Sequence, residues 1–115
     1  MRNIDGLKNN SQFSRVYKLR RSLANSYLIM YIAPNDMEVS RIGISASKKI
    51  GNSVVRHRVS RLVREAYRLH KEALVGGYDM VVVARPDAAQ SGYSQIEEAY
   101  VNLLKRHKLY RAEQE

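Results

Sequence analysis

Apolar residues recur with helix-like and strand-like periods in alternating segments of the chain, which indicates a mixed α+β domain. Phe13, Val16 and Tyr17 lie at positions i, i+3 and i+4 and predict a first helix, capped by a polar residue within 9–11. The last apolar segment predicts another helix, which a capping box at residues 94–97 would open. Its apolar positions are Ile96, Tyr100, Leu103 and Leu104.

Three other segments predict strands. Residues 27–32 are rich in aromatic and branched side chains and are followed by a turn at residues 34–36. Residues 39–46 are apolar at alternate positions, which predicts the second strand of a hairpin, although the turn could equally be a longer loop. Residues 78–84 are apolar on both faces, so we expect this strand near the centre of the sheet.

The longest predicted element is a helix from about Val54 to Ala73, which follows Gly51 and has Asn52 or Ser53 as its N-cap. One arc of this helix is apolar and is expected to face the core. Its members are Val55, Val59, Leu62, Val63, Ala66, Leu69 and Ala73. The predicted order of elements is αββαβα, in a single domain spanning residues 1–115.

The opposite face of the same helix is basic. It carries His57, Arg61, Arg64, Arg68 and Lys71, with Arg56 and Arg58 on its flanks. Between Arg41 and Lys71 there are nine Lys or Arg residues and one acid, Glu65, in a chain of net charge +9. A basic face can be merely solvated, but a solvated helix usually intersperses acids for i,i+4 pairs. The uncompensated charge therefore favours a nucleic-acid partner.

Two lysines, Lys48 and Lys49, directly precede the long helix. Together with the free N–H groups of the helix start, they could bind a phosphate. The same residues could equally form only a turn and a cap.

Composition excludes several other classes. The chain has no cysteine, so disulfides and thiolate metal sites are excluded. It has no apolar run near the roughly 20 residues of a membrane span and no apolar stretch at the N-terminus, so we expect a soluble, cytoplasmic protein. Binding of the long helix to a membrane surface is disfavoured because its apolar face is needed for the core.

The segment from Arg41 to Arg68 reads RIGISASKKIGNSVVRHRVSRLVREAYR and resembles the signature of the ribonuclease P protein subunit. Further similarity covers nearly the whole chain. It includes Phe13 and Tyr17, the tyrosine-bearing strand, the strand from Tyr78 that ends in Ala84-Arg85-Pro86, and the last helix. The family is known for an Arg-Asn-Arg core in the long helix, and this chain differs by having His57 between Arg56 and Arg58.

The resemblance implies a compact α+β fold of the ribosomal protein S5 domain 2-like type, with a four-stranded sheet packed by helices and a left-handed βαβ crossover. It also implies that a large RNA carries out the hydrolysis with Mg²⁺, while the protein binds that RNA and the 5′ leader of precursor tRNA. We therefore expect no catalytic residue and no tightly bound metal in the protein. The expected assembly is one protein per RNA, with no membrane or DNA partner.

Residue roles follow from the same resemblance. Phe13, Tyr17 and Tyr31 match aromatic residues of the leader-binding cleft, although such a cluster could also be ordinary core packing. The RNA-binding set on and before the basic helix is Lys48, Lys49, Arg56, His57, Arg58, Arg61, Arg64 and Arg68. Arginine suits this role because its planar guanidinium can hold two phosphate oxygens.

Two other functions have to be weighed. A nuclease acting without RNA would need clustered carboxylates or a positioned histidine base. The chain offers little of either, since Asp79 and Asp87 flank a strand and Glu97 and Glu98 open a helix, where turn and capping roles suffice. The three histidines fit no metal spacing, and each is expected to be a surface or helix-flank residue. A ribosomal protein is the alternative RNA-binding module, which composition alone cannot exclude.

Overall fold

The computed structural model describes residues 6–111. The three α-helices are α1 (Asn10–Leu19), α2 (Ser53–Leu69) and α3 (Tyr93–Arg106). The four strands are β1 (Ser22–Ala24), β2 (Leu28–Pro34), β3 (Arg41–Ser45) and β4 (Tyr78–Ala84). Three short 3-10 helices connect them: η1 (Lys48–Ile50), η2 (Lys71–Ala73) and η3 (Pro86–Gln90).

The strands form one mixed sheet in the order β1-β2-β4-β3. β4 lies between β2, to which it is antiparallel, and β3, to which it is parallel, so its predicted central position is confirmed. The predicted hairpin of the second and third strands is wrong, because β4 is inserted between them. Residues 35–40 are the longer loop that connects β2 to β3. The succession β3, α2, β4 is the βαβ unit that the resemblance implies.

The strand missing from the sequence-based prediction is β1. It is a three-residue edge strand whose Ser22 and Ala24 are exposed and whose Leu23 is half-buried. A segment this short has too few alternations to stand out by period. It pairs with β2 through the register Ser22 to Tyr31, which completes the four-stranded sheet.

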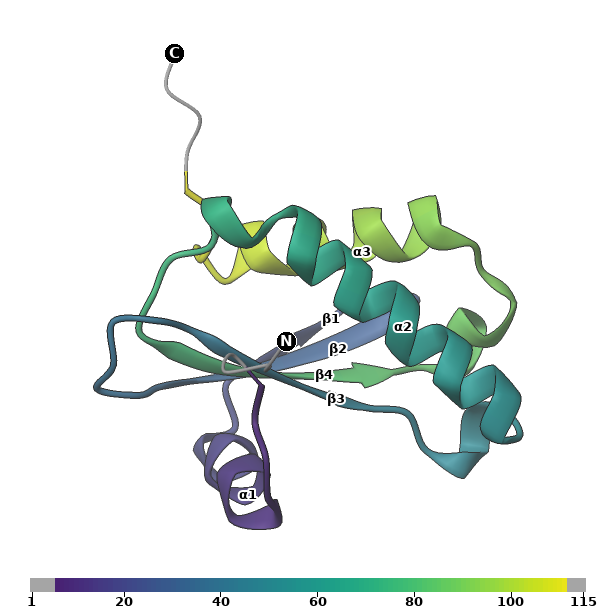
Figure 1. Cartoon of the computed structure of the whole chain (residues 1–115), viewed down its shortest axis with the longest axis horizontal. Helices are drawn as coiled ribbons and strands as arrows, with labels where there is room; N and C mark the ends of the chain where they lie inside the picture. Colours follow the sequence, from purple (N-terminus) through teal and green to yellow (C-terminus); the bar gives the residue numbers. More distant parts are fainter. Residues whose placement is uncertain (1–5, 112–115) are drawn as a thin grey trace.

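The helices cover the two faces of the sheet unequally. Figure 1 shows α2 and α3 together on one face and α1 alone on the other. The main core fills the space under α2 and α3, and a smaller cluster of Val16, Ala33 and Val81 lies under α1. Because α1 has only ten residues, part of the sheet on its side has no helix over it.

The helix starts follow their caps. The side chain of Asn9 caps α1 and forms a capping box with Gln12, and the side chain of Asn52 caps α2. The predicted start of the last helix is wrong, because α3 begins at Tyr93 after Gly92. The Gln95 side chain accepts a hydrogen bond from the Gly92 N–H at 2.8 Å, so the box sits two residues earlier than predicted. The predicted apolar positions of α3 are all confirmed as buried.

The apolar arc of α2 differs from the prediction at its C-terminal end. The α-helix ends at Leu69, which is 54% exposed, and residues 71–73 form η2 instead of a further helical turn. Tyr67, absent from the predicted arc, is buried at 7% exposure. The buried residues of α2 are Val59, Val63, Ala66 and Tyr67. On the helix wheel this arc is shifted towards Tyr67, so Leu69 lies outside it.

Candidate nucleic-acid interface

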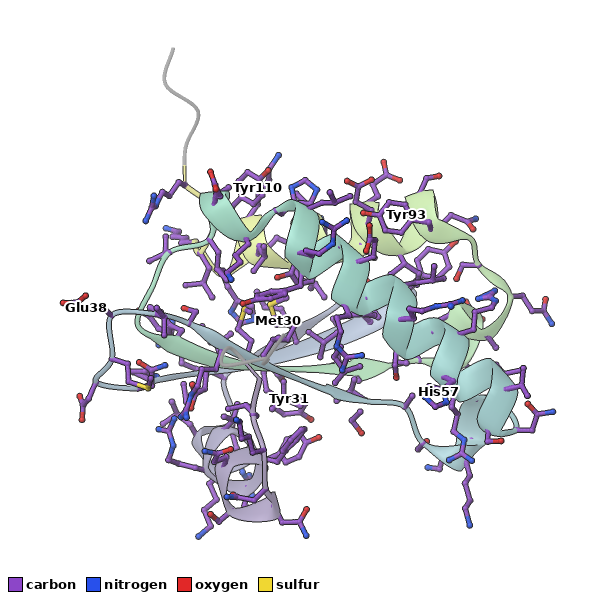
Figure 2. All side chains as sticks on the ribbon, viewed as in Figure 1. Met30, Tyr31, Glu38, His57, Tyr93 and Tyr110 are labelled. Carbon is purple, nitrogen blue, oxygen red and sulfur yellow. The ribbon has the colours of Figure 1, made fainter. Side chains whose placement is uncertain are left out.

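The outer face of α2 presents unpaired cations. Arg61 and Arg64 are exposed, and neither has a hydrogen-bond or ion-pair partner within residues 6–111. His57 is also exposed, at the N-terminal end of α2 (Figure 2). The predicted basic face is therefore confirmed at these positions, where the side chains are available to an external anion.

Arg68 extends this face but has an acidic neighbour. Its guanidinium donates to both carboxylate oxygens of Glu65, at 3.2 and 2.6 Å. The hydrogen bond from Arg68 lowers the pKa of Glu65 below its ordinary value. Both groups are exposed, so Arg68 can exchange this partner for a phosphate at small cost.

Arg58 points into the protein. Its Nη2 donates to the backbone oxygen of Ser91 at 2.7 Å and to that of Ala89 at 3.4 Å, and its side chain is half-buried. These contacts tie α2 to η3 and to the loop before α3. The structure thus gives Arg58 a structural task in addition to the RNA contact predicted for it.

Arg56 lies beside a shallow hollow between β3 and the first turns of α2. The hollow is lined by Ile44, Ala46, Ser53, Arg56, His57 and Ser60. The Nε atom of Arg56 is buried and finds no hydrogen-bond partner among the described residues. A buried guanidinium N–H without a partner is costly, so Arg56 has an unused donor in addition to the part of its side chain that lines the hollow.

Lys48 and Lys49 are exposed in η1, directly before α2. The Ser47 side chain accepts from the Lys49 N–H at 3.2 Å, so the segment is a capped turn. Asn52 caps α2 and accepts from the Val55 N–H at 3.0 Å, which uses one helix donor. The capped turn is therefore present, and neither ammonium group has an ion-pair partner in the described part of the chain.

The three predicted cleft aromatics come together on the α1 side of the sheet. Tyr17 of α1 and Tyr31 of β2 make an edge-to-face contact, with ring centroids 4.8 Å apart and an interplanar angle of 89°. Phe13, Tyr17 and Tyr31 are half-buried and pack against the small core cluster. The three rings therefore pack against the core, and each also keeps a part that is accessible to solvent.

Gly43 of β3 gives Phe13 its position. A Cβ atom at Gly43 would lie 2.5 Å from Cζ of Phe13, which is too close for any real contact. The absence of a side chain at this strand position lets the ring lie directly on the sheet.

The sheet continues beyond these aromatics as an open surface. Ile29, Val83 and Ser45 share the α1 side of the sheet through the register of β2, β4 and β3. All three are half-buried, and Figure 1 shows α1 beneath only one part of the sheet. A single strand with bases stacked on Tyr17 or Tyr31 could run over this surface.

Asp79 at the start of β4 is a buried anchor that sequence reasoning missed. It is fully buried and accepts from Arg41 at 2.9 and 2.8 Å, from Asn35 at 2.8 Å and from Arg15 at 2.5 Å. Burial alone would raise the pKa of Asp79, but hydrogen bonds from Arg41, Asn35 and Arg15 outweigh it and lower that pKa. The sequence did contain a signal, since Asp79 stands inside an apolar strand. A buried carboxylate needs cationic partners, so its position could have predicted ion pairs with arginine.

Two histidines flank helices, as the C-cap residues of α2 and α3, and both also make tertiary contacts. His70 bonds the Tyr110 hydroxyl at 2.9 Å and Glu97 at 2.7 Å. His107 bonds the Met30 carbonyl at 2.9 Å, and burial lowers the pKa of its imidazole. His70 thus joins α2 to α3 and to the C-terminal segment, and His107 joins the end of α3 to β2.

The carboxylates are dispersed. Asp79, Glu65 and Glu97 each face arginine or histidine. Among residues 6–111, no three His, Cys, Asp or Glu side chains lie close enough together to hold a metal ion. In the same part of the chain, none of the helices is both long and apolar enough to cross a membrane.

The fold and its surfaces define a small α+β protein of the nucleic-acid-binding class. A sequence model of the ribonuclease P family matches residues 1–108. The chain belongs to this family. It is 50% identical over 105 residues to the ribonuclease P protein component of Lachnoclostridium phytofermentans, covering 91% of this chain and 90% of the relative. It is 46% identical over 102 residues to that of Clostridioides difficile, covering 88% and 90%.

Solved structures agree with this assignment. The chain superimposes on the Staphylococcus aureus RNase P protein with a TM-score of 0.87 and 34% identity, covering 95% of this chain and 100% of the other. For the RNase P protein of Thermotoga maritima the TM-score is 0.76 at 33% identity, covering 82% and 89%. The resemblance based on residues 41–68 is thereby confirmed over nearly the whole domain.

Proposed function

We propose that this chain binds the catalytic RNA of ribonuclease P and the 5′ leader of precursor tRNA, and so assists endonucleolytic removal of the leader. The family consists of the protein components of bacterial ribonuclease P, which assist an RNA in tRNA 5′ processing. The contacts with leader and RNA, one protein per RNA, and action in the cytoplasm are parts of this proposal.

The outer face of α2 carries the proposal. Arg61 and Arg64 are exposed and without partners in the described part of the chain, and Arg56 has a buried Nε with no acceptor. Arginines that the fold leaves unsatisfied suit phosphate oxygens, which accept two hydrogen bonds from one guanidinium. We assign this face, with Lys48, Lys49, His57 and Arg68, to RNA backbone contact.

The aromatic cluster on the other face of the sheet supports contact with the leader. Single-stranded nucleic acid is bound by stacking bases on aromatic rings beside cationic groups. Tyr17 and Tyr31 are held at a fixed angle by their edge-to-face contact, so little side-chain freedom is lost when a base stacks on them. The Phe13 ring is likewise held in place, because it lies directly against Gly43 of β3.

We assign the hydrolysis to the RNA with its Mg²⁺, and to the protein no catalytic residue. Asp79 is enclosed by Arg15, Arg41 and Asn35. Glu65 and Glu97 are engaged by Arg68 and His70. These carboxylates are therefore used in contacts within the protein, and the task left to the chain is to bind, position and neutralise charge.

The test is cleavage of a precursor tRNA at near-physiological Mg²⁺ by a bacterial ribonuclease P RNA, with and without this protein, and by the protein alone. The proposal predicts stimulation only when RNA and protein are both present. Cleavage by the protein alone would contradict the assignment of chemistry to the RNA. An unchanged rate in the presence of protein would contradict the subunit role.

A further inference from the structure

A second group of cations gathers around the edge strand β1. It consists of Arg20 and Arg21 before the strand, and Arg106 and Lys108 at the end of α3, and we call it the β1-edge surface. All four side chains are exposed. None has an acidic partner within residues 6–111, so the domain leaves this charge uncompensated.

Direct contacts bring the two segments together although they are more than eighty residues apart. The Arg106 guanidinium donates to the backbone oxygen of Ala24 in β1 at 2.9 Å. His107 bonds the Met30 carbonyl of β2 at 2.9 Å, at the strand position that pairs with Leu23 of β1. Arg21 and Arg106 both lie close enough to lower the pKa of His107, after the larger effect of burial.

Helix ends alone do not account for this convergence. Arg20 and Lys108 follow α1 and α3, where a cation interacts favourably with the helix dipole. Each helix could have that benefit without the other. Here Arg21 and Arg106 both lie near His107 at one strand edge, and Arg20 and Lys108 are within two residues of them in the chain. Like charges at one edge repel one another, so an external anion is the simplest source of compensation.

The β1-edge surface is separate from the basic face of α2. β1 is one edge of the sheet and β3, which leads into Lys48 and Lys49, is the other edge. Three strand spacings put these edges about 14 Å apart. One phosphate group cannot contact both the β1-edge surface and the basic face of α2.

The chemistry of the surface favours structured RNA over a single strand. Single-strand sites combine cations with accessible aromatic rings, whereas paired RNA is bound through its backbone and shape. Tyr31, which pairs with Ser22 of β1, contacts Tyr17 edge-to-face on the α1 side of the sheet, and Tyr110 is engaged by the Lys105 ammonium at 5.2 Å and by His70. The β1-edge surface itself thus consists of guanidinium and ammonium groups, whereas the accessible rings of Tyr17 and Tyr31 belong to the aromatic cluster on the α1 side of the sheet.

We propose that the β1-edge surface binds the phosphodiester backbone of a second, structured segment of the ribonuclease P RNA, so that the protein is held between two RNA segments. The inference rests on the proposed function, since it assigns a further contact to the same RNA. It requires no substrate, because the contact is with the RNA subunit and not with the leader.

The test measures the affinity of the full-length protein for ribonuclease P RNA without substrate, as a function of salt. Arg20→Gln/Arg21→Gln should reduce the slope of log affinity against log salt by up to about two units. The matched control, Lys8→Gln/Arg111→Gln, removes the same charge from exposed positions outside both surfaces and should leave the slope unchanged. Equal slopes for wild type and Arg20→Gln/Arg21→Gln would overturn the inference.

A comparison with Arg61→Gln/Arg64→Gln separates this failure from failure of the proposed function. If only the α2 variant lowers the slope, the β1-edge contact is wrong and the subunit role stands. If neither variant lowers it and the protein does not stimulate cleavage, the proposed function is wrong as well. If the two contacts are independent, a variant that combines all four substitutions should show the sum of the two slope changes.

A second readout uses the absence of cysteine in the chain. Ser22→Cys on β1 and Ser53→Cys at the start of α2 are exposed positions for a tethered iron–EDTA probe. The inference predicts that the two probes cleave different segments of ribonuclease P RNA in the absence of substrate. Cleavage of the same RNA segment from both positions, or no cleavage from Ser22→Cys, would overturn it.

Discussion

Asp79 and Arg41 form a two-bond ion pair between β4 and β3, with Oδ1 to Nε at 2.9 Å and Oδ2 to Nη2 at 2.8 Å. The carboxylate is fully buried, while the Arg41 side chain is 19% exposed. Arg15 of α1 reaches the same carboxylate, so one acid connects the sheet to the helix that carries Phe13 and Tyr17. The position of the aromatic cluster therefore depends on a buried charge.

Replacing Asp79 by asparagine should lower the free energy of unfolding by about 3 kcal/mol, because it leaves Arg41 without its buried counter-ion. Urea denaturation monitored by circular dichroism measures this. Glu65→Gln, which breaks an exposed pair with Arg68, is the control and should leave the denaturation midpoint unchanged. A midpoint for Asp79→Asn equal to that of wild type would contradict the anchoring role.

The same carboxylate predicts a pH dependence. The pKa of Asp79 in the folded protein lies below its ordinary value of 3.8, so the unfolded chain takes up a proton at a higher pH than the folded chain. The contribution to stability is complete above about pH 5 and is lost as pH falls through the ordinary value towards the folded pKa. The unfolding free energy of Asp79→Asn should fall less steeply with acidification below pH 5, and a parallel profile would contradict this.

Arg58 and Arg61 should separate structural from RNA-binding roles. Arg58→Ala removes hydrogen bonds to two backbone oxygens and should cost about 1 to 3 kcal/mol of stability. Arg61→Ala should leave stability unchanged and reduce the salt dependence of RNA affinity by up to about one unit. Thermal denaturation and filter binding measure the two effects. Destabilisation by Arg61→Ala would contradict its assignment to an external partner.

Gly43→Ala should disturb the leader cleft without touching the basic helix. The new Cβ would force the Phe13 ring away from β3, at a cost of about 1 to 3 kcal/mol in stability. Affinity for leader-bearing tRNA should fall, while affinity for ribonuclease P RNA should not change. In Gly43→Ala/Phe13→Leu the clashing ring atoms are gone, so stability should recover while leader affinity stays low. Recovery of both would show that Phe13 is only a packing residue.

Periodicity predicted the elements better than their pairing. The three α-helices and the central strand β4 follow from apolar patterns, because a buried face imposes its period on local sequence. The hairpin prediction was wrong because β2 and β3 are close in sequence, while β4, which separates them, comes more than thirty residues later. The edge strand β1 is too short and exposed to leave a pattern.

The candidate site was also predicted only in part from the sequence. Helical spacing predicted the exposed cations of α2, including Arg61 and Arg64, because a helix wheel fixes which side chains oppose the core. It could not predict that Arg58 would reach Ser91, since that contact depends on where η3 packs. The family resemblance placed Tyr17 and Tyr31 in one cleft, but their ring contact is a finding of the structure, because the spacing of a helix and a strand in sequence does not determine their distance in space.

The most direct test of the account compares the affinities of leader-bearing and mature tRNA for the holoenzyme of ribonuclease P RNA with this protein. Variants Phe13→Ala, Tyr17→Ala and Tyr31→Ala are measured beside wild type. Each lost stacking contact should weaken binding of leader-bearing tRNA by about 1 to 3 kcal/mol and leave mature tRNA unaffected. Equal losses for both RNAs would contradict a leader-binding cleft between α1 and the sheet.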